Sequence, residues 1–365
     1  MQGQESLSPS SPQGQPGAEK GTELSSLGEF GLIDRLTRDF PPLHRETRVG
    51  IGDDCAVLVP PAGQETVVTT DLLLEGVHFD LTYFPLMHLG YKAVIVNLSD
   101  VYAMNAKPSQ ITVSLGISKR FSAEQLDELY AGILQACREY EVDLVGGDTS
   151  ASLTGLCISI TAIGYAPRER LVYRSGAKSN QLICVTGNLG AAYMGLLLLE
   201  REKRVMLANP EGQPQLEGYK YVLGRMLRPE ARRDAVEHLE VAGIVPTAMM
   251  DVSDGLSSEL LHLCKSSGVG CRVYPERIPI DREVMQVCDE MGIDPILAAM
   301  NGGEDYELLF TVPMDMQEMV DELGVATIGY TTEAKEALMV TASGQEIPIV
   351  AQGWNAFKQD DGESA

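Results

Sequence analysis

The spacing of apolar residues predicts that helices and strands are mixed in both halves of the chain. Apolar residues spaced three or four positions apart indicate helices, and alternating or short continuous apolar runs indicate strands. In the first half, these patterns predict helices over 29–36, 90–104 and 122–140, and strands over 55–59, 65–70, 110–117 and 155–164. In the second half, they predict strands near 181–186, 270–273 and 307–312, and helices near 189–200, 229–242, 256–266 and 281–291. We therefore expect an α+β fold with two domains.

A polar, basic segment at residues 167–178 separates the two halves. We expect an N-terminal domain over residues 28–166 and a C-terminal α/β domain over residues 167–357. Residues 1–27 are rich in Ser, Pro and Gly and predict a disordered tail, and residues 358–365 predict a second tail.

Composition narrows the possible partners. The 365 residues are 44% hydrophobic, and the formal net charge is −24. Such a charge argues against nucleic acid or an anionic membrane as a partner. Apolar runs such as 196–199 are far too short to cross a bilayer, and the N-terminal segment lacks the apolar core of a signal peptide. The seven cysteines form no C-x-x-C motif, so we expect reduced thiols in a cytoplasmic protein.

Aspartates recur in short clusters with Gly, Ser and Thr, each beside an apolar run that would deliver it to a shared site. Such oxygen-rich clusters suit hard cations such as Mg²⁺, which in turn bind phosphate groups. Two carboxylates ~5 Å apart repel by roughly 3 kcal/mol at an effective dielectric of about 20, so a converging set needs cations or protons. The clusters are Gly52-Asp53-Asp54, Thr69-Thr70-Asp71, Asn97-Leu98-Ser99-Asp100, Gly146-Gly147-Asp148-Thr149 and Asp251-Val252-Ser253-Asp254-Gly255.

Each cluster also has an ordinary structural interpretation as a turn, a helix cap or a buried carboxylate held by backbone donors. The paired glycines at 146 and 147 predict a close backbone approach to phosphate. The run 251–256 is expected to open a helix, with Ser253 or Asp254 as its cap. Arg174 is expected to contact phosphate from a basic cluster near the domain junction. An EF-hand is excluded because His262 occupies the twelfth position of that loop, and the chain has no P-loop motif.

Taken together, the motifs resemble those of the thiamine-monophosphate kinase family. That family shares a fold group with aminoimidazole ribonucleotide synthetase, selenophosphate synthetase and the hydrogenase-maturation carbamoyl dehydratase. The similarity covers residues 28–357. The motifs that carry it are Gly-Glu-Phe at 28–30, Ile-Gly-Asp-Asp-Cys-Ala at 51–56, Thr-Thr-Asp at 69–71, Gly-Val-His-Phe at 76–79, Val-Asn-Leu-Ser-Asp at 96–100, Gly-Gly-Asp-Thr at 146–149, Arg-Ser-Gly-Ala-Lys at 174–178, Ser-Asp-Gly-Leu at 253–256 and Gly-Gly-Glu-Asp-Tyr-Glu at 302–307.

The resemblance implies ATP-dependent phosphorylation of thiamine monophosphate to thiamine diphosphate, the last step in making that cofactor, with several Mg²⁺ ions. It also implies a homodimer in which ferredoxin-like N-terminal domains pair through their sheets as a barrel, with the active site between the domains. The implied Mg²⁺ ligands are Asp54, Thr69, Thr70, Asp71, Asp100, Asp148, Asp251 and Asp254. The implied ATP contacts are Tyr130, Gly147, Asp148, Arg174 and Ser253, and the implied thiamine contacts are His78, Glu304 and Trp354.

Two of the thiamine contacts have alternatives. Trp354 suits an aromatic platform for the cationic thiazolium, or else a packing anchor near the C-terminus, where the family more often has Asp-His after Gly-Trp. His78 is either a substrate contact or an ordinary capping residue.

The acceptor is a phosphate monoester that is largely a dianion at neutral pH, so we expect no catalytic general base. The rival functions are a sister enzyme of the fold group and a non-catalytic Mg²⁺-nucleotide-binding module. Selenophosphate synthetase would need a reactive Cys or Sec near the N-terminus, and the hydrogenase-maturation enzyme a C-terminal Cys; the sequence shows neither.

Overall fold

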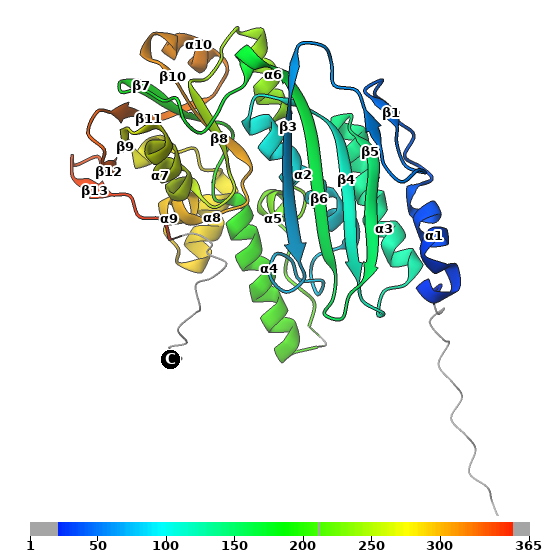
Figure 1. Ribbon diagram of the computed structural model, residues 1–365. Helices are drawn as coiled ribbons and strands as arrows, with labels where there is room; N and C mark the ends of the chain where they lie inside the picture. Colours follow the sequence, from blue (N-terminus) through cyan, green and yellow to red (C-terminus); the bar gives the residue numbers. More distant parts are fainter. Residues whose placement is uncertain (1–20, 211, 353–365) are drawn as a thin grey trace, which may run out of the picture.

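Apolar runs build one large β-sheet in each half of the chain, in a computed structural model that describes residues 21–210 and 212–352 (Figure 1). The first sheet has the order β3-β6-β4-β5. Its strands are β3 (Gln64–Leu74), β6 (Cys157–Pro167), β4 (Lys107–Ile117) and β5 (Asp143–Ala151). The β3/β6 and β6/β4 pairs are antiparallel, whereas β4 and β5 are parallel and are joined through a helix. β3 and β5 are therefore the two edges of this sheet.

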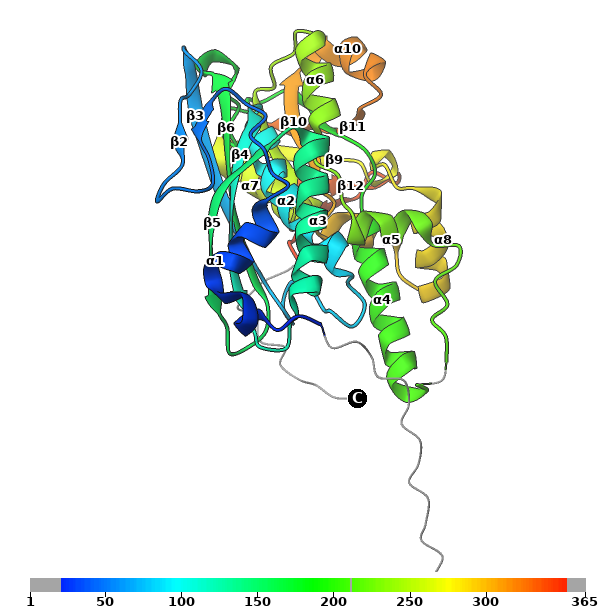
Figure 2. The ribbon, with the colours of Figure 1, turned by 90° about the vertical axis from the view of Figure 1, so that its right-hand side faces the viewer.

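Only one face of the first sheet is covered by helices. Helices α2 (Leu86–Ala103) and α3 (Ala123–Tyr140) pack on that face, and Figure 2 shows no helix of the described chain on the other. Successive side chains of a strand point to opposite faces, so β3 presents alternate residues to each side. Val68 and Leu72 are 64% and 51% exposed on the open face. An exposed apolar face of this kind is typical of a surface that meets another protein.

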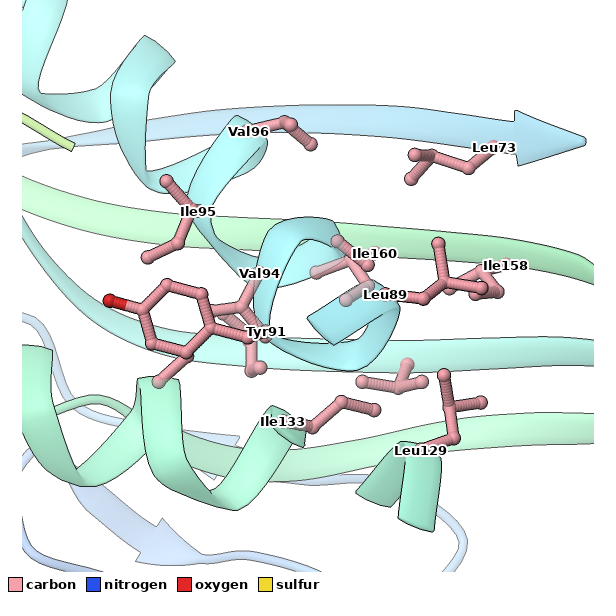
Figure 3. Packing of buried hydrophobic residues seen from close by; sticks show 14 of the residues in the cluster. Leu73, Leu89, Tyr91, Val94, Ile95, Val96, Leu129, Ile133, Ile158 and Ile160 are labelled. Atoms are coloured by element: carbon pink, nitrogen blue, oxygen red, sulfur yellow. The ribbon is translucent and has the colours of Figure 1, made fainter. Parts of the chain in front are cut away.

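Helix α2 is buried on nearly all sides, because it lies between the sheet, α3 and the second half of the chain. Figure 3 shows Leu89, Val94 and Ile95 of α2 between the strands and Ile133 of α3. A helix that is apolar all round is expected in such a position. A Cβ atom at Gly90 would lie 1.9 Å from the Leu129 carbonyl oxygen, so glycine is required for the two helices to approach this closely.

The N-terminal segment wraps the far side of α3. Helix α1 (Leu24–Thr37) begins four residues before the expected boundary at residue 28 and is interrupted at Gly28, where φ is 68°. Arg35 binds both carboxylate oxygens of Asp127, which fastens α1 to α3. A small ribbon of β1 (Thr47–Val49) and β2 (Val57–Leu58) follows.

The second sheet has the order β13-β12-β9-β11-β7-β10-β8, antiparallel except for the β12/β9 pair. Alternate side chains of its central strands point to opposite faces, and helices cover both. Val185 packs toward α7 (Leu256–Ser267) and α9 (Pro295–Asn301), and Cys184 packs toward α6 (Arg233–Val241) and α10 (Gln317–Glu322). Its strands are β7 (Gln181–Val185), β8 (Ala248–Val252), β9 (Gly270–Val273), β10 (Glu307–Pro313), β11 (Ala326–Thr332), β12 (Ala337–Val340) and β13 (Glu346–Pro348).

The remaining helices form a layer beside α2 (Figure 1). They are α4 (Ala191–Ala208), α5 (Lys220–Leu227) and α8 (Arg282–Met291), with the short 3-10 turns η1 (Arg168–Arg170), η2 (Pro275–Arg277) and η3 (Met314–Met316) elsewhere. Within the part of the chain that the structure describes, no helix has the length and apolar character needed to cross a membrane.

The two mixed α/β halves confirm the expected two-domain α+β class. The run from Asp251 leads into a helix as expected, because α7 starts at Leu256, but Asp251 itself lies in the buried strand β8. The expected cap is wrong: Gly255 is the N-cap, and no side chain, neither Ser253 nor Asp254, caps the helix. Gly146 and Gly147 lie inside strand β5, which the sequence patterns missed, and a Cβ at Gly147 would meet the Val113 carbonyl oxygen at 1.8 Å. The narrower description of the first half as ferredoxin-like stays a prediction.

Candidate functional site

The first carboxylate pair lies where β3 faces α2. Thr69 and Asp71 of β3 point toward the helix. The Thr69 hydroxyl donates to Asp100 Oδ2 at 2.5 Å, and the Asp71 backbone N–H donates to Asn97 Oδ1 at 3.0 Å. Asn97 is fully buried and anchors its own amide on the Ala93 carbonyl. These bonds hold Asp71 and Asp100 beside each other on two elements that are distant in sequence.

The third carboxylate comes from the second sheet. Ser99 of α2 donates to Asp251 Oδ2 at 2.6 Å, and Asp251 is only 3% exposed on β8. Because Ser99 precedes Asp100, this bond draws β8 toward the first pair. We call Asp71, Asp100 and Asp251 the acidic junction, since they join elements of both halves of the chain.

The carboxylates of the acidic junction resist ionisation. Burial and the neighbouring Asp100 raise the pKa of Asp71 to about 6. Burial also raises the pKa of Asp100, against the effects of the Thr69 hydroxyl bond and the charge of Arg174. Burial and the nearby Asp100 raise the pKa of Asp251 to about 7. When these three groups ionise, the surrounding protein therefore compensates their negative charge incompletely.

Arg174 is the cation whose field reaches the acidic junction. It lowers the pKa of both Asp100 and Asp251, although its own side chain is exposed. Its backbone carbonyl accepts a bond from Ser267 of α7, which places the basic segment beside the second sheet. An exposed guanidinium next to buried carboxylates is well placed to meet an anionic ligand that approaches them.

Two loops meet next to the acidic junction. The Glu304 backbone N–H donates to the Ser253 carbonyl at 2.7 Å, which joins the loop after β8 to the loop before β10. The Asp254 backbone N–H donates to Glu259 Oε1 at 3.1 Å. Glu259 is itself buried, and its pKa rises to about 8, mainly through burial, with Asp251 and Asp254 contributing. This arrangement leaves the Asp254 side chain exposed at the rim.

Lys92 is a site residue that the sequence analysis missed. Its side chain is 1% exposed on α2, and its Nζ lies 2.7 Å from Glu304 Oε2 and 3.2 Å from the Met226 carbonyl. Glu304 has a φ of 65°, a conformation uncommon for a residue other than glycine. The available signal was a single lysine within an apolar helical run, because a buried lysine needs an anionic partner.

A local hydrogen bond holds His78 at the end of β3. His78 lies in the turn after β3, and its Nδ1 accepts a bond from the Leu74 backbone N–H at 3.0 Å. That bond fits the capping alternative without excluding contact of the ring with a ligand. Trp354 lies outside the described residues.

The remaining expected site residues do not reach the acidic junction within this chain. Asp54 is exposed in the loop between β1 and β2. Thr70 points to the open face of the first sheet, where it bonds Thr161. Asp148 is exposed on the edge strand β5, with Gly147 beside it. Tyr130 is 7% exposed in the core, with its ring edge-on to Phe40.

The described residues contain no group of three His, Cys, Asp or Glu side chains arranged to hold one metal ion. The acidic junction nevertheless offers carboxylate and hydroxyl oxygens, which are the ligands that Mg²⁺ prefers. Burial and the neighbouring Asp100 raise the pKa of Asp71 and Asp251, so a bound cation would stabilise their ionised forms. The donor chemistry therefore fits Mg²⁺.

Comparison with known proteins agrees with this architecture. Residues 52–166 match the AIR synthase related protein N-terminal domain, and residues 178–341 match the corresponding C-terminal domain. The thiamine-monophosphate kinase of Aquifex aeolicus (strain VF5) is 36% identical over 335 residues, which are 92% of this chain and 99% of that protein.

Two solved structures extend the likeness. A crystal structure of the thiamine-monophosphate kinase from Stenotrophomonas maltophilia K279a is 30% identical, with a TM-score of 0.74 over 88% of this chain and 98% of that one. A structure of AaThiL complexed with AMPPCP and TMP is 34% identical, with a TM-score of 0.70 over 92% of this chain and 99% of that one. The chain therefore belongs to the thiamine-monophosphate kinase family of AIR synthase related proteins.

Proposed function

We propose that the protein transfers the γ-phosphoryl group of ATP to thiamine monophosphate and forms thiamine diphosphate. The observation that carries the proposal is the acidic junction, where three incompletely compensated carboxylates from both halves of the chain meet. Relatives with this activity in their names match over nearly the whole chain, and the complex of AaThiL with AMPPCP and TMP supports the pair of ligands.

Mg²⁺ is the cofactor that we propose for this site. Bound cations would neutralise the phosphates of both substrates, which is the main requirement for joining two polyanions. Asp71, Asp100 and Asp251 are the proposed ligands closest to one another, with Thr69 beside Asp100. Asp254 would add an exposed carboxylate from the rim.

The reaction needs no general base. A phosphate oxygen of thiamine monophosphate is already ionised near neutral pH and forms the new bond to the γ-phosphorus, while the bond from that phosphorus to the bridging oxygen of ADP breaks. The work of the protein is then to position and to screen charge. Arg174 suits a phosphate contact, because its guanidinium is exposed beside the acidic junction. Ser253, Gly147 and Tyr130 stay proposals for ATP.

At the thiamine end, we propose Glu304, His78 and Trp354 as contacts. Lys92 fixes one oxygen of Glu304 by an ion pair whose Nζ is buried. The carboxylate is still 31% exposed, so part of it faces outward for a cationic thiazolium. Lys92 therefore acts as a positioning residue for Glu304.

A homodimer would explain the site residues that the single chain leaves apart. Leu72, Ser159, Ser114 and Asp148 form one cross-strand row on the open face of the first sheet. Closing two such sheets into a barrel would cover the exposed apolar side chains and remove the free edges of β3 and β5. Asp148 and Thr70 would then face the partner chain, and we propose that they serve a site shared by the two chains.

Subunit mixing tests the shared site. Asp148→Asn and Asp71→Asn homodimers are each expected to be inactive. Co-refolded mixtures regain activity if the two residues serve one site from different chains, because some sites then hold both native carboxylates. Mixtures as inactive as the parents would place both residues in the same chain's site.

The function itself is tested by ADP release in the presence of Mg²⁺. Thiamine monophosphate should stimulate release, whereas free thiamine and selenide should not. Consumption of ATP that depends on selenide instead would assign a sister activity of the fold group. Binding of Mg²⁺-ATP without stimulated release by any of them would indicate a binding module. The domain division at residues 166 and 167 and the cytoplasmic location also stay proposals.

A further inference from the structure

An open polar cavity of about 480 Å³ lies beside the loop that carries Glu304. It is bordered by α2, the end of α3, helix α5 and the start of β10. None of the residues proposed above for Mg²⁺, ATP or thiamine lines it. Its volume is within the range of small-molecule sites.

The cavity is rich in cations, although the chain as a whole has a net charge of −24. Lys220, Arg225, Arg228 and Arg232 line it together with three glutamates. The arginines are paired with glutamates of the wall, but Lys220 has no ion pair with any described residue. With four positive and three negative groups, the lining carries one positive charge in excess.

Two arginines of the cavity keep unused donors. Arg225 is 9% exposed. One of its Nη atoms donates to Glu307 and to the Asp305 carbonyl, while its Nε has no partner. Arg232 also binds Glu307, and its Nε is likewise buried without a partner. Only five buried side-chain polar atoms among the described residues lack a partner, and these are two of them. Both arginines line the cavity, and because a buried donor without a partner is costly, a phosphate that engaged these guanidinium groups would remove that cost.

We infer that this cavity binds the phosphate group of a small molecule. Phosphate oxygens accept several charge-assisted bonds at once, and guanidinium groups are the side chains best matched to them. The free Lys220 ammonium supplies the additional charge that a dianion requires. A cationic ligand is disfavoured by the excess positive charge, and the buried N–H donors would remain unused around an apolar one.

Inorganic pyrophosphate in EDTA is the probe that separates this cavity from the acidic junction. Without cations, the carboxylates of the junction repel an anion, so binding measured by titration calorimetry at fixed ionic strength reports the cavity. Wild-type protein is expected to bind. Lys220→Glu should weaken binding by about tenfold or more, because it replaces an attractive charge by a repulsive one.

Controls keep the result independent of folding and of the kinase proposal. Lys335→Glu makes the same charge change at another exposed lysine and should bind as the wild type does. Arg228→Ala removes a half-exposed side chain of the lining and should also weaken binding. The measurement uses neither ATP turnover nor thiamine monophosphate, so loss of the proposed activity would leave it unaffected.

Failure of the wild type to bind pyrophosphate would overturn the inference. It would also be overturned if Lys220→Glu and Arg228→Ala bound as tightly as Lys335→Glu. Parallel titrations with inorganic phosphate and AMP distinguish the source of the phosphate group. Tighter binding of AMP assigns the cavity to a nucleotide, and tighter binding of the inorganic anions assigns it to a free phosphate.

Discussion

Replacing Asp71 by Asn should stabilise the metal-free protein while abolishing its activity. The pKa of Asp71 rises from 3.8 to about 6 on folding, through burial and the neighbouring Asp100. A carboxyl group whose pKa rises on folding makes its full contribution to the free energy of unfolding below its unfolded pKa of 3.8. That contribution is lost as the pH rises through the folded pKa of about 6. Each pKa unit corresponds to about 1.4 kcal/mol, so the ionised side chain lowers the free energy of unfolding by about 3 kcal/mol above that range.

Asn has nearly the same shape and carries no charge. The backbone N–H of residue 71 keeps its bond to Asn97 after the substitution. In EDTA at about pH 8, the free energy of unfolding of Asp71→Asn should exceed that of the wild type by up to about 3 kcal/mol, and the difference should fall to about 0.5 kcal/mol at about pH 4. Adding Mg²⁺ should stabilise the wild type more than the variant.

Urea denaturation at the two pH values provides the measurement, with phosphoryl transfer assayed on the same samples. Asp289→Asn, at an exposed position of α8, is the matched control and should change neither quantity. A variant that is less stable than the wild type in EDTA at about pH 8 would show that Asp71 supports the fold, and the electrostatic reasoning would then be refuted.

Three further predictions follow from other contacts of the structure. Lys92→Met removes the buried partner of Glu304. In steady-state kinetics, kcat/KM for thiamine monophosphate should fall by about tenfold or more while KM for ATP stays nearly constant. An equal effect on both substrates would argue that Lys92 does not position Glu304. Glu307→Gln leaves Arg225 and Arg232 without their shared carboxylate. Urea denaturation should show the free energy of unfolding lowered by about 3 kcal/mol. A decrease below about 1 kcal/mol would mean that these ion pairs contribute little to stability. Gly147→Ala would place Cβ 1.8 Å from the Val113 carbonyl oxygen and should disrupt the sheet, whereas a Cβ at Gly146 meets nothing within 4 Å. Equal circular-dichroism melting curves for Gly147→Ala and Gly146→Ala would contradict the strand register.

Regular, strongly patterned elements were predictable from the sequence. The helical pattern over 90–104 and the alternation over 110–117 correspond to α2 and β4. Strand β5 was missed, because Gly146 and Gly147 signal a loop when only local propensity is considered. The reason for Gly147 is its close approach to Val113 on the neighbouring strand, a contact that the local sequence does not reveal.

The candidate site was predictable in its chemistry but only partly in its geometry. Asp71, Asp100 and Asp251 do meet, and their resistance to ionisation agrees with the expected need for cations. The helix after Asp251 was expected where α7 begins, but strand β8, which carries Asp251, was missed, since an Asp-x-Ser-Asp-Gly run shows only the helix start when burial is unknown. Asp148 faces the other side of the sheet, because strand register fixes the face of each residue and register depends on tertiary pairing.

The most direct test of the central claim follows the phosphoryl group itself. Purified protein is incubated with Mg²⁺ and ATP labelled at its γ-phosphate, with thiamine monophosphate or free thiamine as acceptor, and the thiamine compounds are separated by chromatography. We expect the label in thiamine diphosphate from the monophosphate alone, and none after EDTA is added. Label that stays in ATP, or that is released only as inorganic phosphate while thiamine monophosphate is unchanged, would contradict the proposed function.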